Sequence, residues 1–111
     1  MQTSKLILEA SLELKEVGRL LSEARKRRTL SISKLADRIG VDRRTLSQLE
    51  KGSPTVSLGI FFQVLSALQL LRGLSEALKP ENDIEAISAA VRRARRRQPP
   101  LKKISDKKVN F

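Results

Sequence analysis

The sequence predicts an all-α fold in which short amphipathic helices share one modest core. Apolar residues recur at spacings of three and four along successive stretches, which is the period of a helix that buries one face. A Ser or Asp stands before several of these stretches, where it can cap a helix N-terminus. Hydrophobic residues make up 40% of the 111 residues and aromatic residues only 3%, so an aliphatic core is expected. These observations predict five helices followed by an extra C-terminal basic helix.

The first expected helix runs from Thr3 or Ser4 to Arg28. Gly18 interrupts it with a residue of low helix propensity, so we expect a kink there, with a short leading helix before the first helix of the domain proper. The cations of residues 25–28 suit the negative C-terminal end of this helix. Its apolar stripe consists of Leu6, Ala10, Leu14, Val17, Leu21 and Ala24.

Residues 30–52 read as two short helices joined by a tight turn. Ser31 is expected to cap the first helix, which should run to about Ile39. Gly40 lies where the chain must turn, and Asp42 is expected to cap the second helix. That helix should end near Lys51, with Gly52 in a left-handed conformation. The expected core residues of the pair are Leu35, Ala36, Ile39, Leu46 and Leu49.

The remaining side chains of the second helix are polar and lie near its N-terminus. Such a row can enter a DNA major groove, where Arg bonds the O6 and N7 acceptors of guanine and Gln bonds adenine. The solvent-facing row consists of Arg43, Arg44, Thr45, Ser47 and Gln48.

A fourth helix is expected to begin after Ser57 and to run through Leu68, with Phe61 and Phe62 in the core. Beyond it, a leucine-rich segment from residue 70 to 78 fits either a short helix or a strand followed by a helical turn. Six leucines between residues 65 and 78 exceed what so small a core needs, which indicates a subunit interface. The predicted dimer interface consists of Leu70, Leu71, Leu74 and Leu78.

Pro80 breaks the chain, and Asn82 or Asp83 is expected to cap a final helix that ends at Gln98-Pro99-Pro100. We therefore expect two regions. Residues 1–79 form the helical domain with its N-terminal extension and dimerisation segment, and residues 80–111 form a basic helix and tail. The narrow apolar edge of the final helix consists of Ile84, Ile87, Val91 and Ala94.

The net charge is +11, and most of it lies near the C-terminus. Residues 92–108 hold nine Lys or Arg against the single acid Asp106, leaving only +3 for residues 1–91. A polyanionic partner is expected, with nucleic acid the leading candidate and an anionic membrane an alternative. The basic run itself is interpreted as a solvated tail, as a source of nonspecific phosphate contacts, or as a docking segment for an acidic protein.

Several classes of function find no support. The chain has neither Cys nor His, which excludes their metal sites, their nucleophilic or basic catalysis, and disulfides. No glycine-rich phosphate loop or convincing carboxylate pair is present, so we expect no enzyme and no cofactor. Residues 1–10 lack the pattern of a signal peptide, and the uncharged run Thr55–Leu71 is interpreted as a buried helix. A cytoplasmic, bacterial nucleoid-associated location is expected.

Taken together, residues 17–70 resemble the XRE/Cro-type helix-turn-helix of phage-repressor-like regulators, with helix, turn, cap and terminal Glu-Lys-Gly in register. This resemblance implies a lambda-repressor-like DNA-binding domain. Residues 56–68 are similar to the corresponding helix of HipB-type proteins, which are DNA-binding partners of a HipA-like kinase in toxin–antitoxin operons.

The resemblance also implies residue roles. Arg25 and Glu50 align with a partly buried ion pair between the first and third helices of phage repressors. Ser31 and Ile32 stand where many relatives carry a polar residue that contacts phosphate. Ser31 can still make this contact but Ile32 cannot, so Ser33 and Lys34 are expected to take over. The candidate DNA-binding residues are Ser31, Ser33, Lys34, Arg43, Arg44, Thr45, Ser47, Gln48 and Lys51.

Two functions follow from the sequence. In the first, a homodimer binds double-stranded DNA at a palindromic operator and represses transcription. The two half-sites of this operator are expected about one helical turn apart. In the second, the chain is mainly a protein-interaction module that neutralises or complexes a HipA-like kinase toxin.

Overall fold

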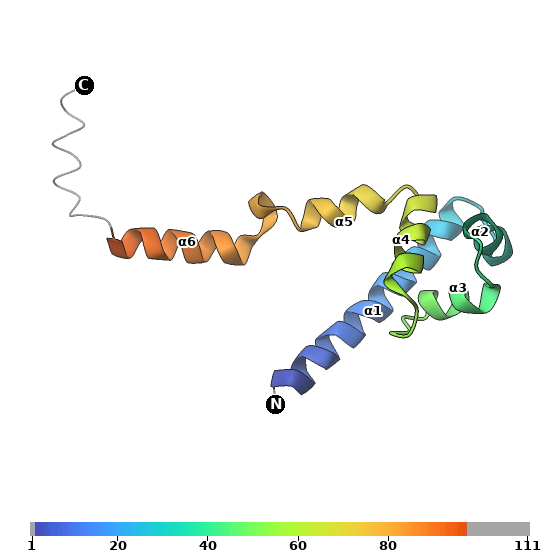
Figure 1. Cartoon of the computed structure of the whole chain (residues 1–111), viewed down its shortest axis with the longest axis horizontal. Coiled ribbons are helices and arrows are strands. Elements are labelled where there is room, and N and C mark those ends of the chain that lie inside the picture. The colour runs from blue at the N-terminus through green and yellow to red at the C-terminus, as the bar shows by residue number, and fades with distance from the viewer. Residues whose placement is uncertain (1, 98–111) are drawn as a thin grey trace, which may run out of the picture. The chain divides into compact units, whose positions relative to one another are not determined.

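A computed structural model describes residues 2–97, which form six α-helices and one 3-10 turn and contain no strand (Figure 1). The expected all-α fold is confirmed. The chain divides into two units, Met1–Arg72 and Gly73–Phe111. The helices are α1 (Gln2–Arg27), α2 (Ile32–Ile39), α3 (Arg43–Glu50), α4 (Leu58–Ala67), α5 (Leu71–Ala77) and α6 (Ile84–Arg97), with the 3-10 turn at Pro80–Asn82.

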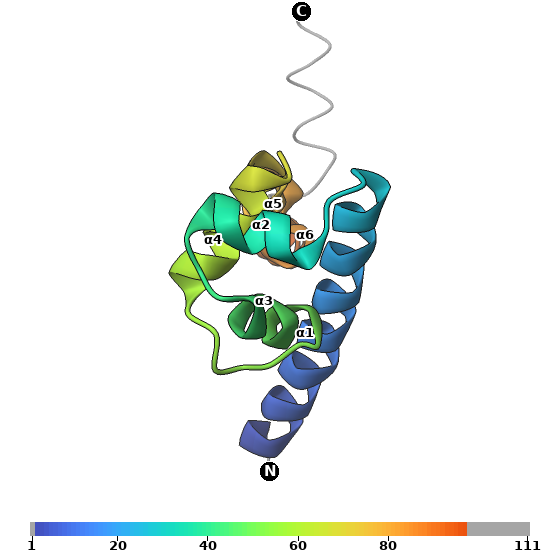
Figure 2. The ribbon, with the colours of Figure 1, turned by 90° about the vertical axis from the view of Figure 1, so that its right-hand side faces the viewer.

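The first unit is built around α2, α3, α4 and the second half of α1. Figure 2 shows α2 above α3, with α1 along one side and α4 along the other. Helix α3 packs against α1 and α2, and α2 also packs against α4. Because every helix contributes short aliphatic side chains, the core is small and close-packed. Its buried apolar residues are Leu21, Ala24, Leu35, Ala36, Leu46, Leu49, Val64, Leu65 and Leu68.

Helix α1 is one continuous helix of 26 residues, so the expected kink and separate leading helix are wrong. Gly18 is buried, and it lies where the backbone of another helix comes close. The residue therefore serves a close approach, and its low helix propensity costs about 1 kcal/mol without ending the helix.

Only the second half of the predicted α1 stripe enters the core. Leu21 and Ala24 are buried, Leu14 and Val17 are half-buried, and Leu6 is 64% exposed. The periodicity correctly identified one face of the helix, but the first-unit core covers only the part of that face nearest to Arg27.

The caps and turns of α2, α3 and α4 are as the sequence predicts. The Ser31 hydroxyl accepts a hydrogen bond from the Lys34 N–H at 3.1 Å, and the Ser57 hydroxyl accepts one from the Ile60 N–H at 3.2 Å. Gly40 and Gly52 have φ values of 73° and 82°, which are left-handed conformations that favour glycine. These local signals set where each helix of the first unit begins and ends.

The two aromatic residues of α4 are less buried than the sequence suggests. Phe61 is half-buried, whereas Phe62 is 39% exposed, so its placement in the core is wrong. Their rings meet edge to face, with centroids 6.0 Å apart and planes at 76°. The core has filled with Val64, Leu65 and Leu68, which occupy the inward side of α4.

The leucine-rich segment forms the helix α5, which resolves the sequence alternatives in favour of a helix. The break between α4 and α5 contains Gln69 with a φ of 62°. Across the described residues, no single helix has the length and apolar character needed to cross a membrane. Helices α4 and α5 meet that length and composition only when they are counted together across their break.

The second unit contains most of α5, the 3-10 turn and α6, and none of these elements has a buried residue. Of the two cap candidates, Asp83 is the one that caps α6: its Oδ1 atom accepts a hydrogen bond from the Ala86 N–H at 3.1 Å. The Asn82 amide instead donates to the Glu76 carbonyl oxygen at 2.7 Å. The expected end of the helix at Gln98-Pro99-Pro100 lies outside the described residues.

Candidate nucleic-acid interface

Helix α3 has one apolar side that is buried in the core and an opposite side that is polar. Leu46 is fully buried and Leu49 is 7% exposed, so the opposite side of the helix must face outward. Arg43 and Arg44 are exposed in its first turn. The N-cap Asp42 sets the start of the helix, because its Oδ1 atom accepts the Thr45 N–H at 2.7 Å. The direction in which the two arginines leave the domain is therefore fixed by core packing and a cap.

Two glycines allow the end of α3 to approach α1 closely. A Cβ atom at Gly18 would lie 2.6 Å from the Glu50 carbonyl oxygen, a separation that real side chains do not tolerate. A Cβ atom at Gly52 would lie 2.6 Å from the Cα of Lys15. Since both obstacles are backbone atoms, neither can move aside cheaply. The glycines hold the C-terminal end of α3 directly against α1.

A buried ion pair makes a second link between α1 and α3, as the family resemblance implies. Arg25 donates from Nε to Glu50 Oε2 at 2.7 Å and from Nη2 to Glu50 Oε1 at 3.1 Å. Both side chains are 9% exposed. A third donation, from Nη1 to the Leu30 carbonyl oxygen at 2.8 Å, ties the α1–α2 connection to the same guanidinium. Such a bidentate pair gives a fixed geometry in addition to its attraction.

An open groove lies between α2 and the start of α3. Three candidate residues, Arg43, Arg44 and Ser47, come together along it. Its remaining lining comes from the first residue of α2, from Asp37 and from the turn. The full lining consists of Ile32, Asp37, Val41, Asp42, Arg43, Arg44 and Ser47.

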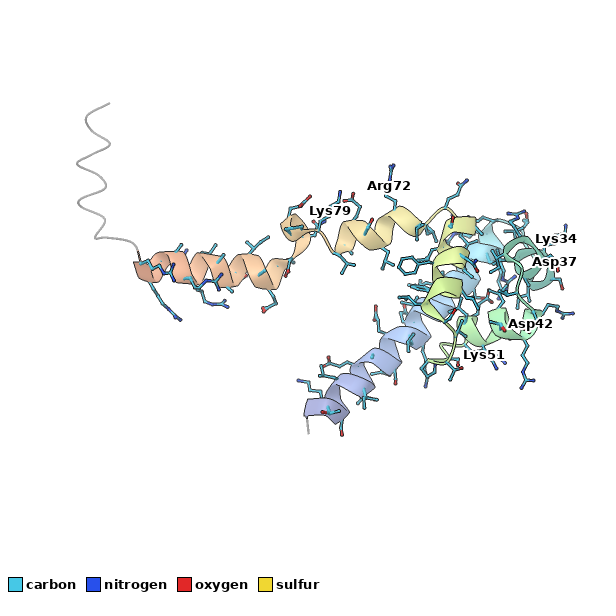
Figure 3. The ribbon with its side chains drawn as sticks, viewed as in Figure 1. Lys34, Asp37, Asp42, Lys51, Arg72 and Lys79 are labelled. Carbon is cyan, nitrogen blue, oxygen red and sulfur yellow. The ribbon has the colours of Figure 1, made fainter. Side chains whose placement is uncertain are left out.

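The other candidates lie around this groove without lining it. Ser33 is half-buried and Lys34 is exposed, both in the first turn of α2, where Ser31 is the cap. Figure 3 shows Lys34 on α2 and Lys51 at the opposite end of α3 from Asp42.

Two further candidates belong to α3 itself. Thr45 and Gln48 are half-buried. Gln48 follows Arg44 by four residues, so the two side chains share one face of the helix. A ligand that follows the outward face of α3 would therefore meet Arg44 first and Gln48 one turn later.

Sequence reasoning missed Asp37, an exposed acid that lines the groove together with Asp42, Arg43 and Arg44. The signal was present, because Asp37 lies two residues after the buried Leu35 and so points away from the core side of α2. A carboxylate there repels phosphate and can accept a hydrogen bond from cytosine N4. The negative charge of Asp37 therefore weakens the nonspecific attraction of anions to the groove.

The pKa of the Asp42 carboxyl in this groove lies below its ordinary value. The hydrogen bond from the Thr45 backbone N–H lowers the pKa of this carboxyl, and the charge of Arg44 acts in the same direction. The carboxylate is therefore ionised throughout the neutral range, and the cap persists there.

The predicted interface leucines are outside the core of the described chain. Leu70 and Leu71 are each 38% exposed, Leu74 is half-buried and Leu78 is 78% exposed. By contrast, Leu65 and Leu68 of the same leucine-rich run belong to the core. A dimer that uses the four predicted leucines remains a prediction.

Residues 21–72 match the model of a protein family described as Helix-turn-helix. The match begins in the second half of α1 and includes all of α2, α3 and α4. These residues are thus an XRE-type helix-turn-helix domain with a lambda-repressor-like fold, and the protein is a DNA-binding transcription regulator. Its partner is double-stranded DNA. No curated protein matches the chain closely enough to name a nearer relative.

Proposed function

We propose that the protein is a sequence-specific repressor that binds a palindromic operator as a homodimer, with α3 reading bases in the major groove. The observation that carries this proposal is the fixed outward face of α3. Leu46 and Leu49 bury its inner side, and Glu50 is clamped by Arg25. Arginine at a fixed angle can form a bidentate pair with guanine, which discriminates against other bases by about 1–3 kcal/mol.

The position of each candidate residue on α2 or α3 indicates whether it contacts bases or phosphates. Arg44, Ser47 and Gln48 lie along the outward side of α3, so base contacts are assigned to them and to Arg43 and Thr45 beside them. Ser31, Ser33 and Lys34 surround the N-terminus of α2, where backbone N–H groups and a lysine suit phosphate oxygens. Lys51, at the far end of α3, suits a second phosphate.

The homodimer is supported by the exposure of the leucines after α4. Within the described residues, Leu70 and Leu71 remain 38% exposed and Leu78 remains 78% exposed. A second copy that covers them would place two α3 helices on one duplex, about one helical turn apart. Sedimentation of the wild-type protein and of a Leu71→Ser/Leu78→Ser variant tests this; a variant that dimerises as well as the wild type contradicts it.

We further propose that the regulated operon is the protein's own and that it encodes a HipA-like kinase, with this chain as the HipB-like component. The likeness of residues 56–68 to the HipB-type helix supports this proposal. Exposed apolar residues on the same helix, Leu58 at 69% and Phe62 at 39%, support the second candidate function, in which complex formation with the kinase dominates.

Footprinting on the DNA upstream of the gene tests the repressor directly. The proposal expects two protected half-sites on one face of the duplex, and expects them to disappear in an Arg43→Ala/Arg44→Ala variant. Absence of protection at low salt, together with stable binding of the purified kinase encoded beside the gene, favours the interaction module instead.

A further inference from the structure

The second unit contains a concentrated positive surface that the helix-turn-helix does not use. Helix α6 places five arginines in its last six residues, and all five are exposed. None of them forms an ion pair with another residue of the described chain. We call this surface the arginine face; it consists of Arg92, Arg93, Arg95, Arg96 and Arg97.

The arginines of α6 are segregated from its apolar residues. At about 100° per residue, the five arginines spread over about 200° of the helix circumference. The apolar edge of Ile84, Ile87, Val91 and Ala94 occupies only about 80° on the other side. Helix α6 itself contains one acid, Glu85, which lies in its first turn, far along the helix from the arginines. The helix therefore offers one uninterrupted cationic surface near its C-terminal end.

This arrangement costs free energy when nothing is bound. Arg92 and Arg96 are four residues apart, as are Arg93 and Arg97, and like charges at this spacing destabilise a helix by about 0.2–0.5 kcal/mol per pair. Helix α6 buries no residue that could offset this repulsion. A polyanion along the arginine face removes the repulsion and so stabilises the helix that presents it.

We propose that the arginine face of α6 binds the backbone phosphates of duplex DNA, in addition to the contacts made by the helix-turn-helix domain. Arginine suits this role because its planar guanidinium forms bidentate hydrogen bonds with phosphate oxygens. Because α6 buries no residue that would fix its arginines relative to a groove, these contacts supply affinity without reading sequence. The inference rests on the proposed DNA-binding function and adds a second, nonspecific binding surface to it.

An anionic membrane is the competing polyanion, and the apolar edge of α6 argues against it. Helices that lie in a membrane interface bury a broad apolar face, commonly with Trp, Phe or Leu. The α6 edge is narrow, ends in the small residue Ala94 and has no aromatic side chain or leucine. Helix α6 therefore has a strong positive charge but only a small apolar surface to insert into a membrane. This combination favours binding to the phosphates of duplex DNA.

The test compares two double variants of the full chain that remove the same charge. Arg92→Gln/Arg96→Gln lies on the arginine face, and Lys5→Gln/Lys15→Gln lies on exposed positions of α1. Affinity for a short random-sequence duplex is measured by fluorescence anisotropy at several salt concentrations. We expect the α6 variant to reduce the slope of log affinity against log salt by nearly two units per chain, at about 0.9 per phosphate. The α1 variant should leave the slope at the wild-type value.

Each outcome separates this inference from the proposed function. Equal slopes for the two variants overturn the role of α6, even if Arg43→Ala/Arg44→Ala still abolishes operator preference. A reduced slope for the α6 variant in a protein without any operator preference supports α6 and contradicts the repressor. Binding to phosphatidylglycerol vesicles that depends on Arg92 and Arg96, with an unchanged DNA slope, overturns the inference in favour of a membrane.

A second measurement does not depend on affinity. Because phosphate contacts relieve the repulsion within α6, amide hydrogen exchange across residues 84–97 should slow when the random duplex is added to the wild-type protein. The α6 variant should show a smaller change. Exchange that is unaffected by DNA in the wild type contradicts the proposal.

Discussion

Helices α3 and α6 both carry exposed arginines, but they are held in opposite ways. Helix α3 buries Leu46 and Leu49, is clamped through Glu50 and is capped by Asp42. Helix α6 has a cap at Asp83 and no buried residue. An arginine reads a base only if its helix is fixed relative to the groove, whereas a phosphate can be met from many angles. The comparison assigns recognition to α3 and nonspecific attachment to α6.

The largest expected effect on stability comes from removing the Arg25–Glu50 ion pair. Glu50→Ala leaves the Arg25 guanidinium buried without its carboxylate, which should cost about 3–5 kcal/mol of folding free energy. Chemical denaturation measures this cost. The double variant Arg25→Met/Glu50→Leu is the control, because an apolar pair of similar volume should restore most of the stability. A loss below 1 kcal/mol for Glu50→Ala would show that the ion pair does not anchor α3.

The two helices can be compared directly by matched truncations. Leu46→Ala in α3 opens a cavity in the core and should lower the free energy of unfolding by about 2–5 kcal/mol. Ile87→Ala in α6 removes an exposed side chain, so its effect should stay within about 0.5 kcal/mol. Both are read from the same denaturation experiment. A comparable cost for Ile87→Ala would mean that α6 is packed in solution, and the contrast between the helices would be lost.

Gly18→Ala tests the close approach of α1 to α3. The new methyl group would press on the Glu50 carbonyl, and overpacking of this kind costs about 1–3 kcal/mol, partly offset by the roughly 1 kcal/mol helix propensity of Ala. We expect a net loss of about 1–2 kcal/mol and weaker operator binding, since the end of α3 must shift. Gly73→Ala is the matched control, because nothing lies near that position. An unchanged or raised melting temperature for Gly18→Ala would contradict the close packing.

The smallest expected effect concerns the cap of α3. The pKa of Asp42 is lowered in the folded state by the Thr45 N–H bond, so its contribution to stability is complete above its ordinary value and is lost as the pH falls through the lowered value. Asp42→Ser keeps a capping oxygen that does not titrate. The variant should therefore lose less stability than the wild type between about pH 5 and pH 2. Thermal unfolding across this range checks it, and identical pH profiles would rule out the cap as a titrating contributor.

The parts of the first unit that the sequence could predict are those set by local chemistry. Ser31, Asp42 and Ser57 are caps because their side chains bond backbone groups three residues away, and Gly40 and Gly52 take positive φ. Such features need only a few neighbouring residues to be recognised. The Arg25–Glu50 pair came from the family resemblance, and it is confirmed.

What the sequence could not predict depends on neighbours distant along the chain. Gly18 looked like a helix breaker, because the backbone of Glu50 that requires a glycine there is 32 residues away. The stripe of α1 gave no sign that Leu6 would stay exposed, since periodicity identifies a face without identifying what covers it. For the same reason the sequence pattern predicts Phe62 in the core, where it is not, and does not identify Asp37 as a groove residue.

If α3 reads sequence and α6 does not, the two helices must affect operator preference differently, and one binding comparison can show this. The ratio of affinities for operator and random duplex is measured for the wild type, Arg43→Ala/Arg44→Ala and Arg92→Gln/Arg96→Gln. We expect the α3 variant to lose at least about 30-fold of the ratio, because two base contacts at about 1–3 kcal/mol each amount to at least about 2 kcal/mol. We expect the α6 variant to weaken both affinities and to keep the ratio. A preserved ratio in the α3 variant, or a collapsed ratio in the α6 variant, would contradict this expectation.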